Sequence, residues 1–218
     1  GNIFAQIAFS PNQDRVTTAV GDPNSNIVRD TVFRNIQRLF RGKINEITKV
    51  DEVTLTDLNT CNSTDGCVKI EVSNNKHKEE IYYFNAEKVI LGDGSSDQRW
   101  TKNKTIVVDG GNLFINSNLY NDSTDYGLGI IVLRDYESGA FGMSGNVYLE
   151  SEVTDLQAVT MVLDGSLFSY SKDQALSIDE ETGEFGWASD VSIPETLSKQ
   201  LVIQGGISSR NTIGGAED

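Results

Sequence analysis

The sequence has few of the side chains that most metal sites require. Its 218 residues include one histidine and two cysteines. These are too few ligands for a structural zinc site or for a metalloenzyme centre built from several histidines. The single histidine, His77, lies in the charged stretch NNKHKEE, and no G-x-S-x-G nucleophile motif accompanies it. The composition therefore gives no support to metal-dependent or serine-hydrolase catalysis.

Long apolar runs and basic residues are also scarce. The longest apolar runs, such as Ile130–Leu133, are far too short to span a bilayer. P-loop, dinucleotide-binding and kinase motifs are missing. Eighteen basic residues stand against thirty-two acidic ones, for a net charge of −14, whereas nucleic-acid binding needs clustered Lys and Arg. We therefore expect no membrane insertion in this segment and no nucleic-acid partner.

The first fifty residues differ from the rest, since they carry seven basic and four acidic groups. Residues 1–10 alternate in the period-two pattern of a half-buried strand, whose apolar face consists of Ile3, Ala5, Ile7 and Phe9. Residues 11–29 contain two prolines and many turn formers, which indicates a linker or loop. This charge distribution would allow the basic N-terminal fifty residues to contact the acidic remainder of the chain or of another copy.

Residues 30–42 are expected to form a helix. Asp30 is a suitable N-cap and Gly42 a suitable stop, and between them the apolar residues recur at helical spacing. The basic face of this helix consists of Arg34, Arg38 and Arg41. These arginines either form a solvated face or dock onto an acidic protein surface.

From Val50 onward the pattern is β, and one unit recurs. Each copy has three or four apolar residues, a polar or glycine corner, and a short segment that begins near Gly and Asn or Ser. The apolar runs begin at Ile106, Ile130, Val159 and Leu201, and the second segments begin at Gly111, Gly145, Gly165 and Gly205. Variable insertions on a fixed two-strand unit are typical of stacked repeats. We therefore expect residues 50–218 to form a right-handed parallel β-helix (solenoid) with the 30–42 helix as its N-terminal cap. A β-sandwich is the alternative.

Two cysteines flank a short polar loop. Cys61 and Cys67 bracket NSTDG, five turn formers that allow the sulfurs to meet. We expect a local disulfide, which favours an oxidising, extracellular location. A pair of reduced thiols is the alternative.

The candidate site residues are few. A polysaccharide-cleaving site would use the acidic residues after the apolar runs, with an arginine to stabilise charge: Asp109, Asp135, Asp164 and Arg134. Recurring Asp at corners is also a turn signal. Oxygen donors in GDGSSD make Asp93 and Asp97 weak calcium candidates. Trp100 and Trp187, in inserted loops, are candidate glycan or partner contacts, or they cover the base of a loop.

Several segments resemble repeats of large uncharacterised surface proteins of ultrasmall candidate-phylum bacteria. The segments are GLGIIVLRD, GNVYLESEVT, DGSLFSYS and ISSRNTIGG, within residues 104–215. The resemblance implies a secreted, β-rich surface protein and brings no catalytic signature.

We therefore expect a non-enzymatic extracellular segment of a surface layer, fibre or adhesin stalk that binds no cofactor, or calcium at most. Its partner would be another copy or the continuation of the same chain, added head-to-tail. Residues 1–10 would pair in their own chain or add to the open sheet of a neighbouring subunit. A carbohydrate-binding adhesin and a polysaccharide lyase or hydrolase are the alternatives.

Overall fold

The structure, a computed structural model, describes most of the chain from residue 47 onward. The described residues are 47, 49–61, 66–73, 78–121, 123, 125–133, 144–163, 165–171, 176–178, 185–187 and 200–209. The chain divides into two units, residues 1–48 and 49–218, and the strands belong to the second. The expected strand at 1–10, linker at 11–29 and helix at 30–42, with Arg34, Arg38 and Arg41, lie outside the described residues.

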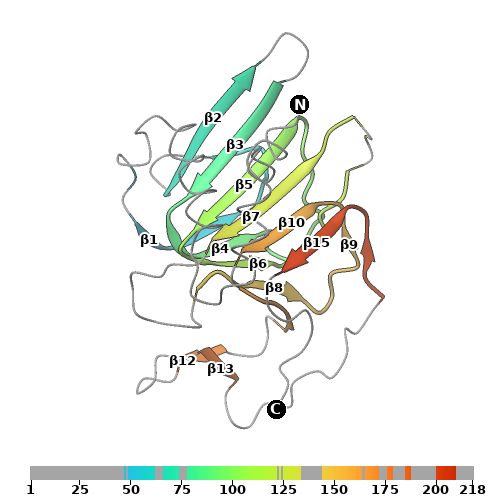
Figure 1. Cartoon of the computed structure of the whole chain (residues 1–218). Helices are drawn as coiled ribbons and strands as arrows, with labels where there is room; N and C mark the ends of the chain where they lie inside the picture. The colour runs from blue at the N-terminus through green and yellow to red at the C-terminus, as the bar shows by residue number, and fades with distance from the viewer. Residues whose placement is uncertain are drawn as a thin grey trace, which may run out of the picture. The chain divides into compact units, whose positions relative to one another are not determined.

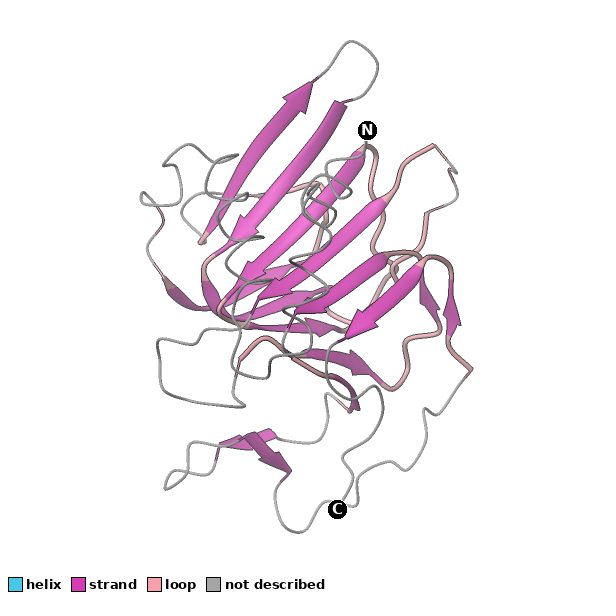
Figure 2. Ribbon diagram, in the orientation of Figure 1, coloured by secondary structure: helices cyan, strands magenta, loops and turns pink. Residues whose placement is uncertain are grey.

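The described part of the chain is mostly β, as the sequence predicts, and its regular elements are strands (Figure 2). One sheet has five parallel strands. In spatial order these are β1 (Val50–Leu55), β4 (Ala86–Leu91), β6 (Asn112–Ile115), β8 (Val147–Glu150) and β11 (Leu167–Tyr170). Within the described residues, no helix is long and apolar enough to cross a membrane.

The second sheet has six strands, which lie side by side in Figure 1. In spatial order these are β15 (Gly206–Ser209), β10 (Val159–Leu163), β7 (Leu128–Leu133), β5 (Asn103–Asp109), β3 (Lys78–Phe84) and β2 (Cys67–Ser73). All neighbours are parallel except β2 and β3, which are antiparallel. A β-sandwich consists of antiparallel sheets, so the described pairing does not match that alternative.

The chain alternates between the two sheets. Four strands of the six-stranded sheet are each followed along the chain by a strand of the five-stranded sheet, and we call each such pair a level: β3–β4, β5–β6, β7–β8 and β10–β11. A third ladder joins the levels through the bridges Gln98–Leu119 and Leu119–Leu156 and through β9 (Asp155–Leu156) with β14 (Val202–Ile203). A separate antiparallel pair consists of β12 (Leu176–Ile178) and β13 (Phe185–Trp187).

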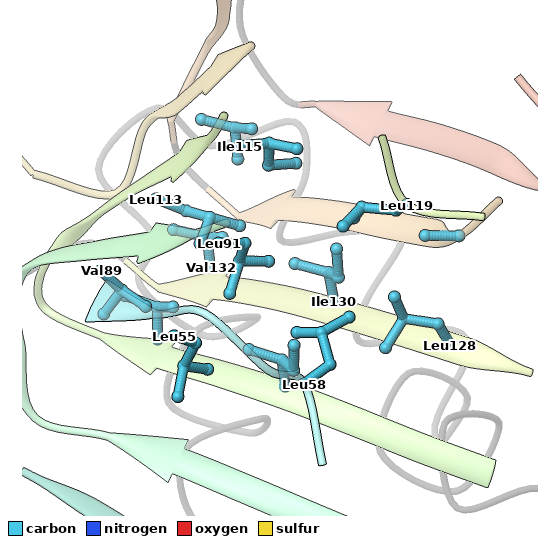
Figure 3. Close-up of a cluster of buried hydrophobic side chains, with 14 of the residues drawn as sticks. Leu55, Leu58, Val89, Leu91, Leu113, Ile115, Leu119, Leu128, Ile130 and Val132 are labelled. Atoms are coloured by element: carbon cyan, nitrogen blue, oxygen red, sulfur yellow. The ribbon is translucent and has the colours of Figure 1, made fainter. Parts of the chain in front are cut away.

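Matching positions of successive levels form columns of apolar side chains. In the five-stranded sheet one column consists of Val53, Val89, Leu113, Val147 and Leu167. All five side chains are buried in the main core, part of which is shown in Figure 3. Burial of each side chain contributes ~1.5–3 kcal/mol before the entropy of ordering is subtracted. The repeated apolar runs are therefore what makes the levels stack.

The corner between the two sheets explains the repeated Gly-Asn and Gly-Ser pairs. A Cβ on Gly111 would lie 1.9 Å from the carbonyl oxygen of Ala86, and a Cβ on Gly165 would lie 1.9 Å from that of Gly145. Each level thus passes so close to the one before it that only glycine fits. Next to these glycines, the side-chain oxygen of Asn112 accepts a hydrogen bond from the amide of Asn146 at 3.0 Å. Asn146 accepts one from the amide of Ser166 in the same way, also at 3.0 Å.

The register of the repeat agrees with the sequence for the first two copies. Ile106 pairs with Ile130 as expected. The third run pairs with the second but is offset by one residue, since Thr160 and not Val159 pairs with Ile130. The fourth apolar run, however, pairs through Val202 and Ile203 with β9 in the third ladder. The strand that continues the six-stranded sheet is the following segment, in which Gly206 pairs with Val159. The expected alignment of the fourth copy was wrong because the third ladder is also apolar, and a period-two pattern does not distinguish one ladder from another.

Candidate functional site

The cysteine pair ties the entry of β2 to the core. Cys61 and Cys67 form a disulfide, with their Cα atoms 5.6 Å apart. Cys67 is buried in the main core, and Cys61 packs against it. The closed loop is short, so loop-closure entropy accounts for about 2 kcal/mol of stabilisation. The bridge fixes the start of the only hairpin that the described residues add to the parallel sheets.

One predicted catalytic residue, Asp109, falls within the described residues. Its carboxylate accepts a hydrogen bond from the hydroxyl of Tyr83 on the neighbouring strand β3. The register places Asp109 beside Leu133, which in turn pairs with Leu163. The strand position next to Asp109 in the sheet is therefore occupied by a leucine and not by a second acidic residue. Arg134, Asp135 and Asp164 lie outside the described residues.

The predicted contact residue Trp100 belongs to the core, which corrects the expectation that its ring is available to a glycan or partner. Its side chain is buried, with a relative exposure of 3%. The indole Nε1 donates a hydrogen bond to the carbonyl oxygen of Tyr126 at 3.0 Å. A buried ring offers no face to a ligand, and loop position in the sequence did not reveal this packing. The side chain of Trp187 lies outside the described residues.

The two calcium candidates have different surroundings. Asp93 accepts hydrogen bonds from the amide and the hydroxyl of Ser95, at 2.8 and 2.6 Å, which is a turn contact. Asp97 accepts one from the side-chain amide of Asn118 at 3.1 Å and lies 3.7 Å from Arg99. Among the described residues, no three His, Cys, Asp or Glu side chains are grouped so that they could hold a metal ion.

A buried pair of charges lies on the neighbouring strands β3 and β5 of the six-stranded sheet. Glu80 and Lys104 occupy paired positions of these strands, and their charged atoms are 2.9 Å apart. The Lys104 side chain has no exposure, and its Nζ lies 3.9 Å from the centre of the Tyr82 ring. Lys102 and Lys69 also reach the Glu80 carboxylate, at 2.8 and 3.5 Å.

The charges of this cluster shift its pKa values. Burial alone would raise the pKa of Glu80, but hydrogen bonds from Lys102 and Lys104 and the charges of Lys104 and Lys69 outweigh it and lower the pKa from 4.5 to about 2. Burial lowers the pKa of Lys104, although Glu80 acts in the opposite direction. Burial and the Glu80 carboxylate raise the pKa of Tyr82. The cluster is therefore a network of charges that keeps Glu80 ionised.

Aromatic rings stack on the other face of the five-stranded sheet. The rings of Phe114 and Tyr148 are 4.6 Å apart between centroids and nearly parallel, and Tyr148 and Phe168 follow at 5.5 Å. Tyr170 meets Phe114 edge-on at 5.3 Å, and its hydroxyl donates a hydrogen bond to the side-chain oxygen of Asn116. Burial and the charge of Glu150 raise the pKa of Tyr170, so this hydroxyl remains a donor.

A polar pocket of about 130 Å³ lies beyond the ends of β4, β6 and β8. It is lined by Gly94, Ser95, Ser96, Asp97, Asn116, Ser117, Asn118, Glu150, Glu152 and Val153. The lining comes from three successive levels, because the same corner follows each strand of the five-stranded sheet. We take this pocket, which we call the corner pocket, as the candidate functional site.

Internal hydrogen bonds hold the walls of the corner pocket. The side-chain oxygen of Asn118 accepts hydrogen bonds from the amides of Thr154 and Asp155, at 2.8 and 3.1 Å, while its nitrogen donates to Asp97. The hydroxyl of Ser117 accepts from the amide of Gly94 at 3.0 Å. The walls from three levels are therefore fixed before any ligand arrives.

Sequence reasoning missed both the charge cluster and the corner pocket. Glu80 and Lys104 are 24 residues apart. Each lies near the start of its strand, where a charged residue does not stand out in the sequence. The pocket residues are ordinary turn formers taken one at a time. The only available signal was positional, since Asp97, Asn116 and Glu150 all come shortly after or at the end of an apolar run.

Comparison with known proteins adds no name to this site. No family model matches the chain, and no curated protein or solved structure matches it.

Proposed function

We propose that the chain from Val50 onward forms a right-handed parallel β-helix that serves as a non-enzymatic structural segment of an extracellular surface protein. The observation that supports this proposal is the matched parallel pairing of successive levels in two sheets and in a third ladder. Repeats of this kind stack one-dimensionally, because each level contacts only its neighbours. Such a segment is suited to a surface layer, a fibre or an adhesin stalk.

Right-handed winding follows from chain chirality. Each return to the six-stranded sheet is a connection between two parallel neighbours of the same sheet, as from β5 to β7 through β6. Such crossovers are right-handed in almost all proteins, because twisted strands pack back onto their sheet in that hand only. The third ladder supports a coil with three sides.

The two ends of the stack differ in a way that favours directional assembly. At one end, the edge strand β2 carries Lys69 and Glu71, which form an ion pair at 3.1 Å; charged side chains on an edge strand discourage pairing. At the other end, Val202 and Ile203 of β14 are each 44% exposed. Of the described strands, β15 has β10 as its only neighbour. We propose that a further level adds here, supplied by the same polypeptide or by another copy.

Electron microscopy combined with light scattering at rising concentration tests this assembly. The protein should form end-to-end particles, and the double variant Val202→Lys/Ile203→Lys should reduce them at unchanged unfolding midpoint. Tyr126→Lys is the matched control, because Tyr126 is also an exposed apolar residue, at 41%. A monomer at every concentration contradicts self-assembly.

Residues 1–10, with Ile3, Ala5, Ile7 and Phe9, remain a proposed assembly strand that lies outside the described residues. A strand added to an open sheet edge gains backbone hydrogen bonds without large side-chain contacts. If this strand joins neighbouring copies, deletion of residues 1–10 abolishes the particles. Particles that persist after the deletion would remove the strand from the mechanism.

The extracellular location rests on the disulfide and on the resemblance to surface proteins. Structural disulfides persist mainly in oxidising compartments. Mass spectrometry of the protein isolated from its native cells should find Cys61 and Cys67 bonded, and surface labelling of intact cells should reach it. Reduced thiols in native material would contradict the location.

A polysaccharide lyase or hydrolase remains the second proposal, with Asp109, Asp135, Asp164 and Arg134 as its candidates. A broad glycan panel should show cleavage that alanine at Asp109, Asp135 or Asp164 abolishes without unfolding. Absence of cleavage by the unaltered protein would contradict it.

A further inference from the structure

The corner pocket is lined mainly by polar side chains. Eight of its ten lining residues have polar side chains. They include hydroxyls and side-chain amides, which both donate and accept hydrogen bonds, as well as carboxylates, which only accept. Polar groups of this kind match a ligand with several hydroxyl groups, although Asn116, Ser117 and Asn118 also form hydrogen bonds within the protein.

Among the described residues, two groups donate hydrogen bonds to the carboxylate of Glu150, which lines this pocket. The residue is buried, at 2% exposure. Its oxygens accept hydrogen bonds from the amide of Glu152 at 2.7 Å and from the hydroxyl of Ser151 at 3.3 Å. An ionised carboxylate accepts about four hydrogen bonds. A ligand that brings donors would therefore satisfy a carboxylate that the fold has already removed from solvent.

The charge of the pocket restricts the ligand further. Asp97, Glu150 and Glu152 are acidic, and none of the residues that line the pocket is basic. The guanidinium of Arg99, which does not belong to the lining, lies 3.7 Å from the carboxylate of Asp97. An anionic ligand would meet like charge here, and the chain as a whole carries a net charge of −14. The pocket should therefore reject acidic sugars such as uronates.

The volume sets the size of the ligand. About 130 Å³ is well below the ~300–1,000 Å³ of pockets that hold drug-sized molecules. One sugar residue is of the right order, with the remainder of the glycan outside.

We infer that the corner pocket binds one uncharged or amino-bearing sugar residue of a glycan and excludes uronic acids. This inference is independent of end-to-end assembly, since the pocket uses no sheet edge. It also differs from the predicted contacts at Trp100 and Trp187, because hydrogen bonds in the pocket replace ring stacking.

Calorimetric titration with three tetrasaccharides, of glucose, glucosamine and galacturonate, tests the inference. The glucose or the glucosamine tetramer should bind, and the galacturonate tetramer should not. Glu152→Gln should weaken binding of the glucosamine tetramer about tenfold, which is the usual effect of losing one hydrogen bond to a charged group. Glu71→Gln has the same charge change on the distant strand β2 and should leave binding unchanged.

The outcomes that overturn the inference are distinct. They are the absence of binding by both glucose and glucosamine tetramers, equal binding of galacturonate, or equal affinity in Glu152→Gln. Titration with calcium alone is the remaining arm: calcium that binds and is lost in Glu152→Gln, without any sugar binding, would make the pocket a cation site. Glu152 is exposed, so its conversion to Gln should leave the fold intact, and an unchanged unfolding midpoint verifies this.

Discussion

Lys104 places its ammonium 2.9 Å from the carboxylate of Glu80, in paired positions of two parallel strands inside the core. The next strand continues the same column with Leu128. An ion pair thus occupies positions that apolar side chains fill in the neighbouring level. Charges in such a place are tolerated only because each satisfies the other.

Removal of one member of this pair should be costly. Glu80→Gln leaves Lys104 buried without its counter-charge and should lower the free energy of unfolding by about 3–5 kcal/mol. The double variant Glu80→Gln/Lys104→Met should be more stable than Glu80→Gln alone. Urea unfolding at pH 7 measures both.

The exposed pair Lys88–Glu52 is the matched control, because its atoms are also 2.9 Å apart while the side chains are 40% and 49% exposed. Glu52→Gln should cost less than about 1 kcal/mol. Similar losses in Glu80→Gln and Glu52→Gln would show that burial of the first pair has no energetic consequence.

Protonation of Glu80 should lower the stability of the folded protein at acidic pH. Its pKa in the folded protein is lowered from 4.5 to about 2. A lowered carboxyl pKa adds stability that is complete above the unfolded value and is lost as the pH falls from about 4.5 toward about 2. The difference corresponds to about 3 kcal/mol. Urea midpoints between pH 6 and pH 2 should show this loss.

Other carboxylates titrate in the same range, so the comparison with Glu80→Gln isolates the contribution of Glu80. That variant should lose less stability than the unaltered protein between pH 4.5 and pH 2. Parallel pH profiles for the two proteins would contradict the role of Glu80.

Replacement of glycine by alanine should destabilise the protein at Gly111, where a Cβ would clash, but not at Gly206, where there is space for it. Gly111→Ala would bring a Cβ to 1.9 Å from the Ala86 carbonyl oxygen, which requires the backbone to shift and should cost at least about 2 kcal/mol. Gly206→Ala meets nothing within 4 Å and should change stability by less than about 0.5 kcal/mol. Thermal or urea unfolding measures both variants. Equal losses of stability in Gly111→Ala and Gly206→Ala would show that the backbones of the two levels are farther apart than in the structure.

Thr160 should be replaceable with a gain in stability. Its hydroxyl is fully buried and has no hydrogen-bond partner, in a column shared with Ile106 and Ile130. Thr160→Val removes the unsatisfied hydroxyl at nearly constant shape and should raise the free energy of unfolding by about 1 kcal/mol. Thr154→Val is the contrasting variant, because that hydroxyl donates to Asp155 at 2.8 Å, and it should destabilise. A loss of stability in Thr160→Val would indicate a partner for its hydroxyl.

The candidate site was less predictable than the fold. Asp97 was predicted as an oxygen ligand and does line the corner pocket, but the sequence offered no reason to join it to Asn118 or Glu150. Trp100 was expected at a surface and lies in the core. The missed grouping of Asp97 and the misplaced Trp100 have the same cause. Both residues lie in loops, and the residues around a loop come from other levels, which are distant in the sequence.

Features that depend on neighbouring residues along the chain could be predicted from the sequence. Alternating and continuous apolar runs made strands, the polar loop between Cys61 and Cys67 allowed their disulfide, and glycines marked the corners. Features that depend on which strands lie side by side became visible in the fold. Register placed Glu80 against Lys104 and moved Val202 and Ile203 into the third ladder. Local pattern does not encode these pairings, because parallel strands are joined by long connections and a period-two run fits any ladder of the stack.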